Sequence, residues 1–273
     1  MKLSVKEKSR LKNKYGEWAI VTGASSGIGL ELATQLADAS FNLIINARNS
    51  EKLKSVEQEL KSKHNIQIKI VDADLSESNG IEKIIAASQN LNVGLLINNA
   101  GYGTSGLFLD SSLHQEINML KVNCEAVLSL THYFSQRFKK QQRGGIIFLS
   151  SLVAFQGVPY AANYAATKAY IQSFAEALTI ELKPFGVDVL TAAPGPVESG
   201  FGNRANMKMN GALKPAQLGV PILESLGKQN NVIPGLLSKI LIYSLRTVPR
   251  WVKIKIMQQV MGGFTKHQRT SNS

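Results

Sequence analysis

A chain of 273 residues, 44% of them hydrophobic, is long enough to bury the core of one α/β domain, and its composition does not require a second domain. The formal net charge is +12, but it sits at the ends: residues 1–14 carry +5, residues 204–273 carry +10, and the stretch between them carries −3. The basic tails contain no recognised nucleic-acid-binding motif, which argues against a nucleic-acid partner. The single cysteine, Cys124, excludes an internal disulfide and predicts a reducing, cytoplasmic environment.

The chain opens with a basic, polar segment, residues 1–14, which lacks the apolar core of a secretory signal and is expected to be a frayed arm. Strand-like and helix-like patterns then alternate from Trp18 to Val189. This alternation predicts an α/β fold with a single doubly wound parallel sheet and helices on both of its faces.

The first apolar run, Trp18–Thr22, is typical of a buried parallel strand and leads into a glycine-rich turn and a helix pattern. Backbone N–H groups and the helix dipole at such a turn favour a pyrophosphate, and glycines allow its close approach. The predicted dinucleotide-binding residues of the turn are Gly23, Ser25, Ser26, Gly27, Ile28 and Gly29. Their spacing is not the common Gly-x-Gly-x-x-Gly, so a glycine-rich turn without a ligand is the alternative.

The second strand, Phe41–Ala47, is followed by Arg48, where many dinucleotide-binding enzymes have an acidic residue that holds the ribose hydroxyls. Because an arginine can pair with a 2′-phosphate, we expect NADP(H) to be favoured, with NAD(H) as a second possibility. The alternative is a solvated arginine at the start of the helix that carries Lys52 and Lys54.

Three further strands, predicted at 66–71, 93–97 and 145–149, end in polar or glycine-containing segments. The carboxyl ends of parallel strands open into one crevice, so these segments are expected to line the dinucleotide site. The residues are Asp74 and Leu75 after the third strand, Asn99, Ala100 and Gly101 after the fourth, and Ser151 after the fifth. The alternative is that each segment is an ordinary turn, since these residue types are common in turns. That alternative does not explain why such segments follow strand after strand.

Tyr164 and Lys168 stand four residues apart, which places them on one face if these residues form a helix. A tyrosine titrates near ~10, and an adjacent cation is expected to lower its pKa toward the operating range. Ser151 is then able to hydrogen-bond the substrate oxygen that the tyrosine protonates. The alternative is an amphipathic helix with a surface tyrosine and lysine.

Several motifs occur together in a fixed order: Thr22-Gly23-x3-Gly27-x-Gly29, Asn98-Asn99-Ala100-Gly101, Ser151, Tyr164-x3-Lys168 and Pro194-Gly195. From about Trp18 to Phe201 the chain therefore resembles the short-chain dehydrogenase/reductase family. The resemblance implies one Rossmann-type catalytic domain, placed here at 15–235 with about seven parallel strands and a lid at 201–231. It also implies hydride transfer between a nicotinamide and a carbonyl or alcohol substrate.

The same resemblance implies a role for each site residue. Tyr164 corresponds to the acid/base, Ser151 orients the substrate oxygen, and Lys168 holds the nicotinamide ribose and lowers the pKa of Tyr164. Asn123 resembles a fourth member that anchors a water in the proton relay. The turn that receives the nicotinamide carboxamide corresponds to Pro194, Gly195, Val197 and Ser199, with Ser199 where threonine is common. A homodimer or homotetramer is implied through helices near 118–138 and 163–182.

The last strand is expected at Val232–Gly235, followed by a basic, hydrophobic helical extension at 236–273, the least typical part of the chain. It contains no apolar run of the roughly twenty residues that a transmembrane helix needs. One interpretation is a cap packed on the body or on a neighbouring subunit. The other is a segment that lies on an anionic membrane surface and inserts Trp251, Ile254 and Ile256.

The predicted function is an NADP(H)-dependent oxidoreductase that interconverts a ketone or aldehyde and an alcohol. The lid favours an apolar acyl, lipid-like or steroid-like substrate, because its apolar residues are Met207, Met209, Leu213, Ile222 and Leu226. The alternative is a catalytically silent NAD(P)-sensing regulator on the same scaffold, but such proteins usually lose the tyrosine or the lysine. No metal site is expected, since the histidines lack ligand spacing.

Overall fold

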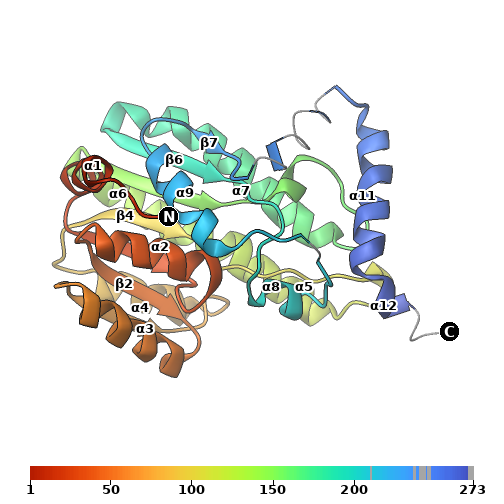
Figure 1. Cartoon of the computed structure of the whole chain (residues 1–273), viewed down its shortest axis with the longest axis horizontal. Coiled ribbons are helices and arrows are strands. Elements are labelled where there is room, and N and C mark those ends of the chain that lie inside the picture. Colours follow the sequence, from red (N-terminus) through yellow and green to blue (C-terminus); the bar gives the residue numbers. More distant parts are fainter. Residues whose placement is uncertain (210, 236–237, 240–243, 245–246, 270–273) are drawn as a thin grey trace.

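The computed structural model of the chain describes residues 1–209, 211–235, 238–239, 244 and 247–269. Its centre is one parallel sheet in the order β3-β2-β1-β4-β5-β6-β7 (Figure 1). The strands are β1 (Trp18–Thr22), β2 (Asn42–Ala47), β3 (Ile68–Asp72), β4 (Val93–Asn98), β5 (Gly144–Leu149), β6 (Val187–Ala192) and β7 (Asn231–Val232). The predicted doubly wound parallel sheet is confirmed.

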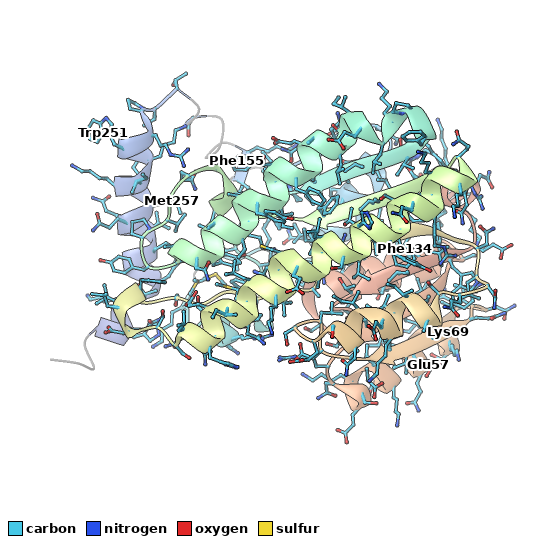
Figure 2. The ribbon with its side chains drawn as sticks, turned by 180° about the vertical axis from the view of Figure 1, so that it is seen from behind. Glu57, Lys69, Phe134, Phe155, Trp251 and Met257 are labelled. Atoms are coloured by element: carbon cyan, nitrogen blue, oxygen red, sulfur yellow. The ribbon has the colours of Figure 1, made fainter. Side chains whose placement is uncertain are left out.

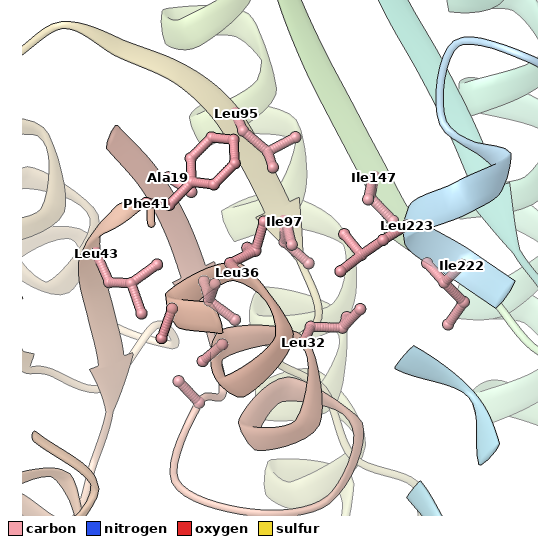
Figure 3. Packing of buried hydrophobic residues seen from close by; sticks show 14 of the residues in the cluster. Ala19, Leu32, Leu36, Phe41, Leu43, Leu95, Ile97, Ile147, Ile222 and Leu223 are labelled. Atoms are coloured by element: carbon pink, nitrogen blue, oxygen red, sulfur yellow. The ribbon is translucent and has the colours of Figure 1, made fainter. Parts of the chain in front are cut away.

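Helices cover both faces of the sheet, because successive strand residues point to opposite sides. Ala19 and Val21 pack into one hydrophobic cluster, whereas Trp18 and Ile20 pack into the other. The first cluster lies under α2 (Gly27–Asp38), α3 (Ser50–Lys63) and α9 (Gly219–Ser225), and Figure 3 shows its side chains. The second lies under α4 (Ser78–Ala87), α6 (Ala126–Gln141) and α7 (Ala162–Glu181).

The remaining helices gather at the two ends of the strands. They are α1 (Val5–Tyr15), α5 (Leu113–Leu120), α8 (Gly200–Arg204), α11 (Arg250–Phe264) and α12 (Lys266–Arg269). Short 3-10 turns are η1 (Phe108–Asp110), η3 (Leu152–Phe155), η4 (Lys183–Phe185) and η5 (Pro215–Gln217), and η2 (Lys121–Glu125) is a π-helical turn. In Figure 1, α11 and α12 stand beside the sheet layers, at the end of the molecule opposite α1.

The strand order reverses between β1 and β4, so the loops that follow these two strands diverge to opposite faces. A crevice opens at such a point outside the carboxyl ends of the strands. The glycine-rich turn follows β1, and the Asn99–Gly101 segment follows β4. The topology therefore places the predicted motifs around one opening.

The prediction of a frayed N-terminal arm is wrong, because α1 is docked on the amino end of the sheet. Ser4 caps the helix by accepting a hydrogen bond from the Glu7 N–H. Leu11 and Tyr15 are fully buried, and Glu7 pairs with Lys228 at 2.7 Å. The Ser4-x-x-Glu7 spacing is a capping-box signature that could have revealed the helix from the sequence.

The predicted lid also needs a correction, because its second half belongs to the main core. Ile222 and Leu226 are fully buried with the α2 side of the sheet, whereas Met207 and Met209 lie in a separate cluster with Tyr164. The last strand is β7, slightly before the predicted Val232–Gly235.

Part of the C-terminal extension can be compared with its prediction. The expected apolar positions Leu237, Ile240, Leu241 and Leu245 lie outside the described residues. Among the residues that are described, none of the helices has the length and apolar character needed to cross a membrane. The helical character of the extension is confirmed for α11 and α12.

Candidate active site

A cavity of about 1150 Å³ opens at the carboxyl ends of the strands. Every predicted site residue lines it except Gly29 and Asn123, which stand directly behind its wall. Those that line it are Gly23, Ser25, Ser26, Gly27, Ile28, Arg48, Asp74, Leu75, Asn99, Ala100, Gly101, Ser151, Tyr164, Lys168, Pro194, Gly195, Val197 and Ser199. The fold thus brings together residues that are up to 176 positions apart in the chain.

The glycine-rich turn is held by side chains of its neighbours. The Asn99 side-chain amide donates to the carbonyl oxygens of Thr22 and Gly23 at 2.8 and 3.2 Å. The Thr22 hydroxyl accepts from the N–H groups of Asn99 and Ala100. A Cβ at Gly29 would collide with the Gly23 carbonyl and the Asn99 amide, so only glycine fits there. The turn is therefore rigid, and the structure gives Asn99 a bracing role.

Arg48 follows β2 and reaches across to Asp74, which follows the neighbouring strand β3. Its guanidinium lies 3.5 Å from the Asp74 carboxylate. Burial tends to raise the pKa of Asp74, but hydrogen bonds from Ser76 and the charge of Arg48 outweigh it and leave the pKa below its ordinary value. Asp74 stays ionised and steadies a guanidinium whose outer side remains half exposed.

The Pro194–Ser199 turn joins β6 to α8 and faces the glycine-rich turn. Ser199 caps α8 by accepting from the Phe201 N–H. A Cβ at Gly27 would lie 3.0 Å from the Ser199 side chain, so these two turns meet across the cavity. The Pro194 carbonyl accepts from the Leu152 N–H, which ties the turn to the segment that follows Ser151.

Tyr164 lies in the first turn of α7 and is buried at the cavity wall. Phe201 packs on it with ring centroids 5.2 Å apart. Burial raises the pKa of the Tyr164 phenol to about 12, and a hydrogen bond with Ser151 lowers it only in part. The phenol is therefore protonated at neutral pH and is close enough to Ser151 to share one substrate oxygen.

Lys168 lies one turn further along α7 and is also buried. Its ammonium donates to the Leu149 carbonyl at 2.7 Å and stands 5.9 Å from the centroid of the Tyr164 ring. Burial lowers the pKa of Lys168 to about 8. Desolvation dominates the pKa of the Tyr164 phenol and raises it, and the expected lowering of this pKa by Lys168 stays a prediction.

Asn123 sits in the π-helical turn η2, where both ends of its amide are bound. Its oxygen accepts from the Tyr102 N–H at 3.1 Å, and its nitrogen donates to the Tyr102 carbonyl and to Thr167 at 2.9 and 3.0 Å. Thr167 directly precedes Lys168 in α7. Asn123 therefore ties the loop after β4 to the helix that carries Tyr164, and π-helical turns of this kind often mark functional sites.

One wall of the cavity was not anticipated from the sequence. It comes from α8 and α11, through Phe201, Arg204, Lys253, Ile256, Met257, Val260, Met261 and Phe264. In Figure 2, Met257 is on the side of α11 toward the body, near Phe155, and Trp251 points outward. The recurrence of apolar residues every three or four positions in α11 was a usable signal. Of the residues expected to enter a membrane, Ile256 lines the cavity and Ile254 packs near Gly157.

Comparison with known proteins decides the family. A family model described as short chain dehydrogenase matches residues 17–210. The chain belongs to the short-chain dehydrogenase/reductase family. It is thus an oxidoreductase that acts on CH–OH donors.

Two relatives illustrate the range of this family. The chain is 32% identical over 232 residues to a 7beta-hydroxysteroid dehydrogenase of Mediterraneibacter gnavus, an alignment that covers 82% of this chain and 88% of that protein. It is 35% identical over 187 residues to a very-long-chain 3-oxoacyl-CoA reductase of Meyerozyma guilliermondii, which covers 64% of this chain and 55% of that protein.

Solved structures give the same family. A structure from a study of 7beta-hydroxysteroid dehydrogenase stereoselectivity superposes with a TM-score of 0.84 at 28% identity, over 90% of this short-chain dehydrogenase and 98% of that chain. A short-chain dehydrogenase from Sphingobium yanoikuyae in complex with NADPH superposes with a TM-score of 0.79 at 25% identity, over 84% and 92%.

Proposed function

We propose that this short-chain dehydrogenase/reductase is an NADP(H)-dependent enzyme that interconverts an apolar ketone or aldehyde and its alcohol. The observation that supports this most is the convergence of Tyr164 and Ser151 with the glycine-rich turn in one cavity whose far wall is apolar. A catalytically silent sensor would not need a protonated phenol beside a hydrogen-bonding serine at that position.

The residues present fit a phosphorylated dinucleotide. The rigid turn at Gly23–Gly29 offers N–H groups and the N-terminus of α2 to a pyrophosphate. Arg48 presents a half-exposed guanidinium where a ribose 2′-phosphate would be recognised. Lys52 lines the same end of the cavity. The NADPH complex of the structural neighbour agrees with this choice, and NAD(H) would leave the Arg48 guanidinium without a phosphate.

When bound, the nicotinamide supplies or accepts a hydride, and the protein handles the proton. In the reductive direction, the Tyr164 phenol gives its proton to the carbonyl oxygen as that oxygen gains charge. Ser151 donates a hydrogen bond to the same oxygen and orients it. Lys168 is placed to bind ribose hydroxyls and to stabilise the phenolate that remains. Asn123 keeps the loop after β4 in register with α7.

The substrate is proposed to be apolar, with an acyl, lipid-like or steroid-like body. Its chamber is lined by aromatic and methionine side chains from α8, α11 and the loop after α8, including Phe201, Met207, Met209, Met257 and Phe264. The two relatives named above act, by their names, on a hydroxysteroid and on a very-long-chain 3-oxoacyl-CoA.

The test is a screen of the purified chain with NADPH and then NADH against matched ketones. The panel contains steroid ketones, long-chain oxo compounds and small polar ketones, and the loss of absorbance at 340 nm is followed. We expect turnover with NADPH that rises with the apolar area of the ketone. Turnover restricted to small polar ketones would contradict the substrate class, and no turnover of any ketone or alcohol would favour the sensor.

We also propose a homodimer or homotetramer, because α5, α6 and α7 expose apolar side chains. These are Leu113, Ile117, Leu120, Leu128, Tyr170 and Ile180. Peripheral membrane contact would now depend on Trp251, Arg250 and Lys255, which are exposed on α11. Ile254 and Ile256 face the body. Co-sedimentation with anionic vesicles at low salt tests that contact, and absence of binding would remove it.

A further inference from the structure

The cavity is strongly cationic. Its lining includes five cationic side chains (Arg48, Lys52, Lys168, Arg204 and Lys253) but only one carboxylate, Asp74. Three of these cations belong to the dinucleotide side, and the fourth, Arg204 of α8, packs on an aromatic ring. Arg48 pairs with Asp74, Lys52 stands in the first turn of α3 next to it, and Lys168 binds the Leu149 carbonyl. The guanidinium of Arg204 lies 3.6 Å above the Tyr102 ring, in the electrostatic field of Arg48 and Asp74.

Lys253 is different, because it belongs to the substrate wall. Residues 253, 256, 257, 260, 261 and 264 recur at helical spacing and form the stripe of α11 that faces the cavity. Five of these six positions are apolar, and the first is Lys253. Lys253 is half-buried at a position where the helix pattern favours an apolar residue, so an anionic group in the cavity can pair with its ammonium partly shielded from water.

Among the described residues, no carboxylate pairs with Lys253. The sequence contains no Asp or Glu after Glu224, so neither α11 nor α12 carries a carboxylate side chain. The charge on this wall is therefore available to a ligand.

The position of Lys253 on α11 indicates how far the anionic group of that ligand lies from its reacting carbonyl. Met261, on the same stripe, belongs to the cluster that contains Tyr164. Lys253 precedes Met261 by eight residues, which corresponds to roughly 12 Å along a helix that rises ~1.5 Å per residue. A ligand that spans this stripe has its reacting carbonyl near one end of the apolar wall and its anionic group near the other.

We propose that Lys253 selects apolar carbonyl substrates that carry a carboxylate at the end remote from the carbonyl. This inference rests on the proposed function and narrows its substrate class from apolar carbonyls to amphipathic, anionic ones. Lys253 is a specificity residue here and takes no part in the proton transfer.

A binding test separates this role from turnover. The full-length protein, saturated with NADPH, is titrated with 8-anilinonaphthalene-1-sulfonate and with N-phenyl-1-naphthylamine, which share an apolar skeleton but differ in the sulfonate. The variants are Lys253→Met, Lys253→Arg and Lys255→Met. Lys255 is the matched control, because it is exposed on the same helix and its ammonium lies 5.3 Å from the centroid of the Trp251 ring.

We expect Lys253→Met to weaken binding of the sulfonate probe roughly tenfold, the loss typical of a hydrogen bond to a charged group, and to leave binding of the neutral probe unchanged. Lys253→Arg keeps the preference for the sulfonate, and Lys255→Met behaves like the wild type. Equal affinities of wild type and Lys253→Met for the sulfonate probe, or the same loss in Lys255→Met, would overturn the assignment.

A turnover test distinguishes this inference from the proposed function. A steroid ketone whose side chain ends in a carboxylate is compared with its methyl ester. We expect kcat/KM to favour the acid in the wild type and the preference to fall roughly tenfold in Lys253→Met, mainly through KM. Reduction of both compounds without a preference contradicts the role of Lys253 and leaves the reductase intact. A Lys253-dependent probe affinity without any turnover contradicts the reductase instead.

Discussion

Tyr164 and Lys168 are buried side by side, and burial shifts their pKa values in opposite directions, away from each other. The pKa of the phenol rises to about 12, and that of the ammonium falls to about 8. At neutral pH the protein therefore holds a protonated phenol, which is the form that a carbonyl reduction consumes. The neutral tyrosine can act as an acid, whereas its action as a base requires a cation or hydrogen bonds that stabilise the phenolate.

Replacement of Tyr164 with Phe removes the proton donor and keeps the ring that packs on Phe201. We expect kcat to fall by about 10²–10⁴, the usual contribution of general acid–base catalysis, with little change in NADPH affinity. Stopped-flow reduction and NADPH fluorescence titration measure the two effects. Wild-type turnover in this variant would contradict the assignment of the acid.

Replacement of Lys168 with Met separates stability from activity. The pKa of Lys168 is about 8 in the folded protein and ordinarily 10.5. Below pH 8 the lysine is therefore protonated in both the folded and the unfolded chain, and the folded protein bears the full cost of burying the ammonium. Between these values the unfolded chain holds more protons, and stability rises with pH. Each pKa unit corresponds to ~1.4 kcal/mol, and the hydrogen bond to Leu149 offsets about 1 kcal/mol of this cost. The free energy of unfolding of the variant should therefore exceed that of the wild type by on the order of 2 kcal/mol at pH 7.

Urea unfolding at pH 7 and near pH 10 checks this sign. The advantage of Lys168→Met should shrink as the pH rises, while NADPH affinity and turnover are reduced at both values. A variant that is less stable than the wild type at pH 7 would show that the burial of Lys168 is compensated by contacts of the ammonium.

Arg48 provides the test of cofactor preference. Arg48→Ala should cost on the order of 1.5–3 kcal/mol in NADPH binding and little in NADH binding, because only NADPH carries the 2′-phosphate. Titration of both cofactors by fluorescence gives the two values, and Lys54→Ala, on the helix α3 that follows Arg48, is the control. Equal losses of binding free energy for NADPH and NADH would show that Arg48 contacts a part of the nucleotide other than the 2′-phosphate.

At the scale of elements, α6 and α7 are the helices through which we propose that copies of the chain meet. Leu128 on α6 and Ile180 on α7 are exposed, and so are Ser173 and Ala177. Ala165, nearer the start of α7, is buried beside Tyr164 and is not part of this exposed face. The proposed contact surface on α7 therefore lies along Ser173, Ala177 and Ile180, away from Tyr164.

Leu128→Asp should shift the chain toward a monomer, because it introduces a charge into the apolar contact. Multi-angle light scattering at micromolar concentration measures the mass. The control is Leu109→Asp, since Leu109 is 94% exposed and lies in η1, outside these helices. A wild-type protein that is already monomeric, or an unchanged mass in Leu128→Asp, would contradict this interface.

At the scale of the whole molecule, α1 closes the end of the sheet opposite the active site. Tyr15 packs on Gly145, and its hydroxyl donates to Asp188 at 2.6 Å, where Lys14 also binds. Arg10 donates to the Leu226 carbonyl just after α9. The first helix thus binds the segments around β5, β6 and α9, and it belongs to the cooperative core.

Leu11→Ala should lower the free energy of unfolding by about 2–5 kcal/mol, because a fully buried leucine leaves a cavity. Lys6→Ala, on the exposed side of the same helix, should change it by less than ~0.5 kcal/mol. Chemical denaturation measures both. If Leu11→Ala is as stable as Lys6→Ala, α1 unfolds independently of the domain.

The strands, the glycine-rich turn and the placement of Tyr164 beside Lys168 could be predicted from the sequence, because each depends on local spacing. A parallel strand is an apolar run, and residues four apart share a helix face wherever the helix lies. The docking of α1, the inward face of α11 with Lys253, and the raised pKa of Tyr164 could not. They depend on which distant segments exclude water from a side chain, and only the packed tertiary structure decides that.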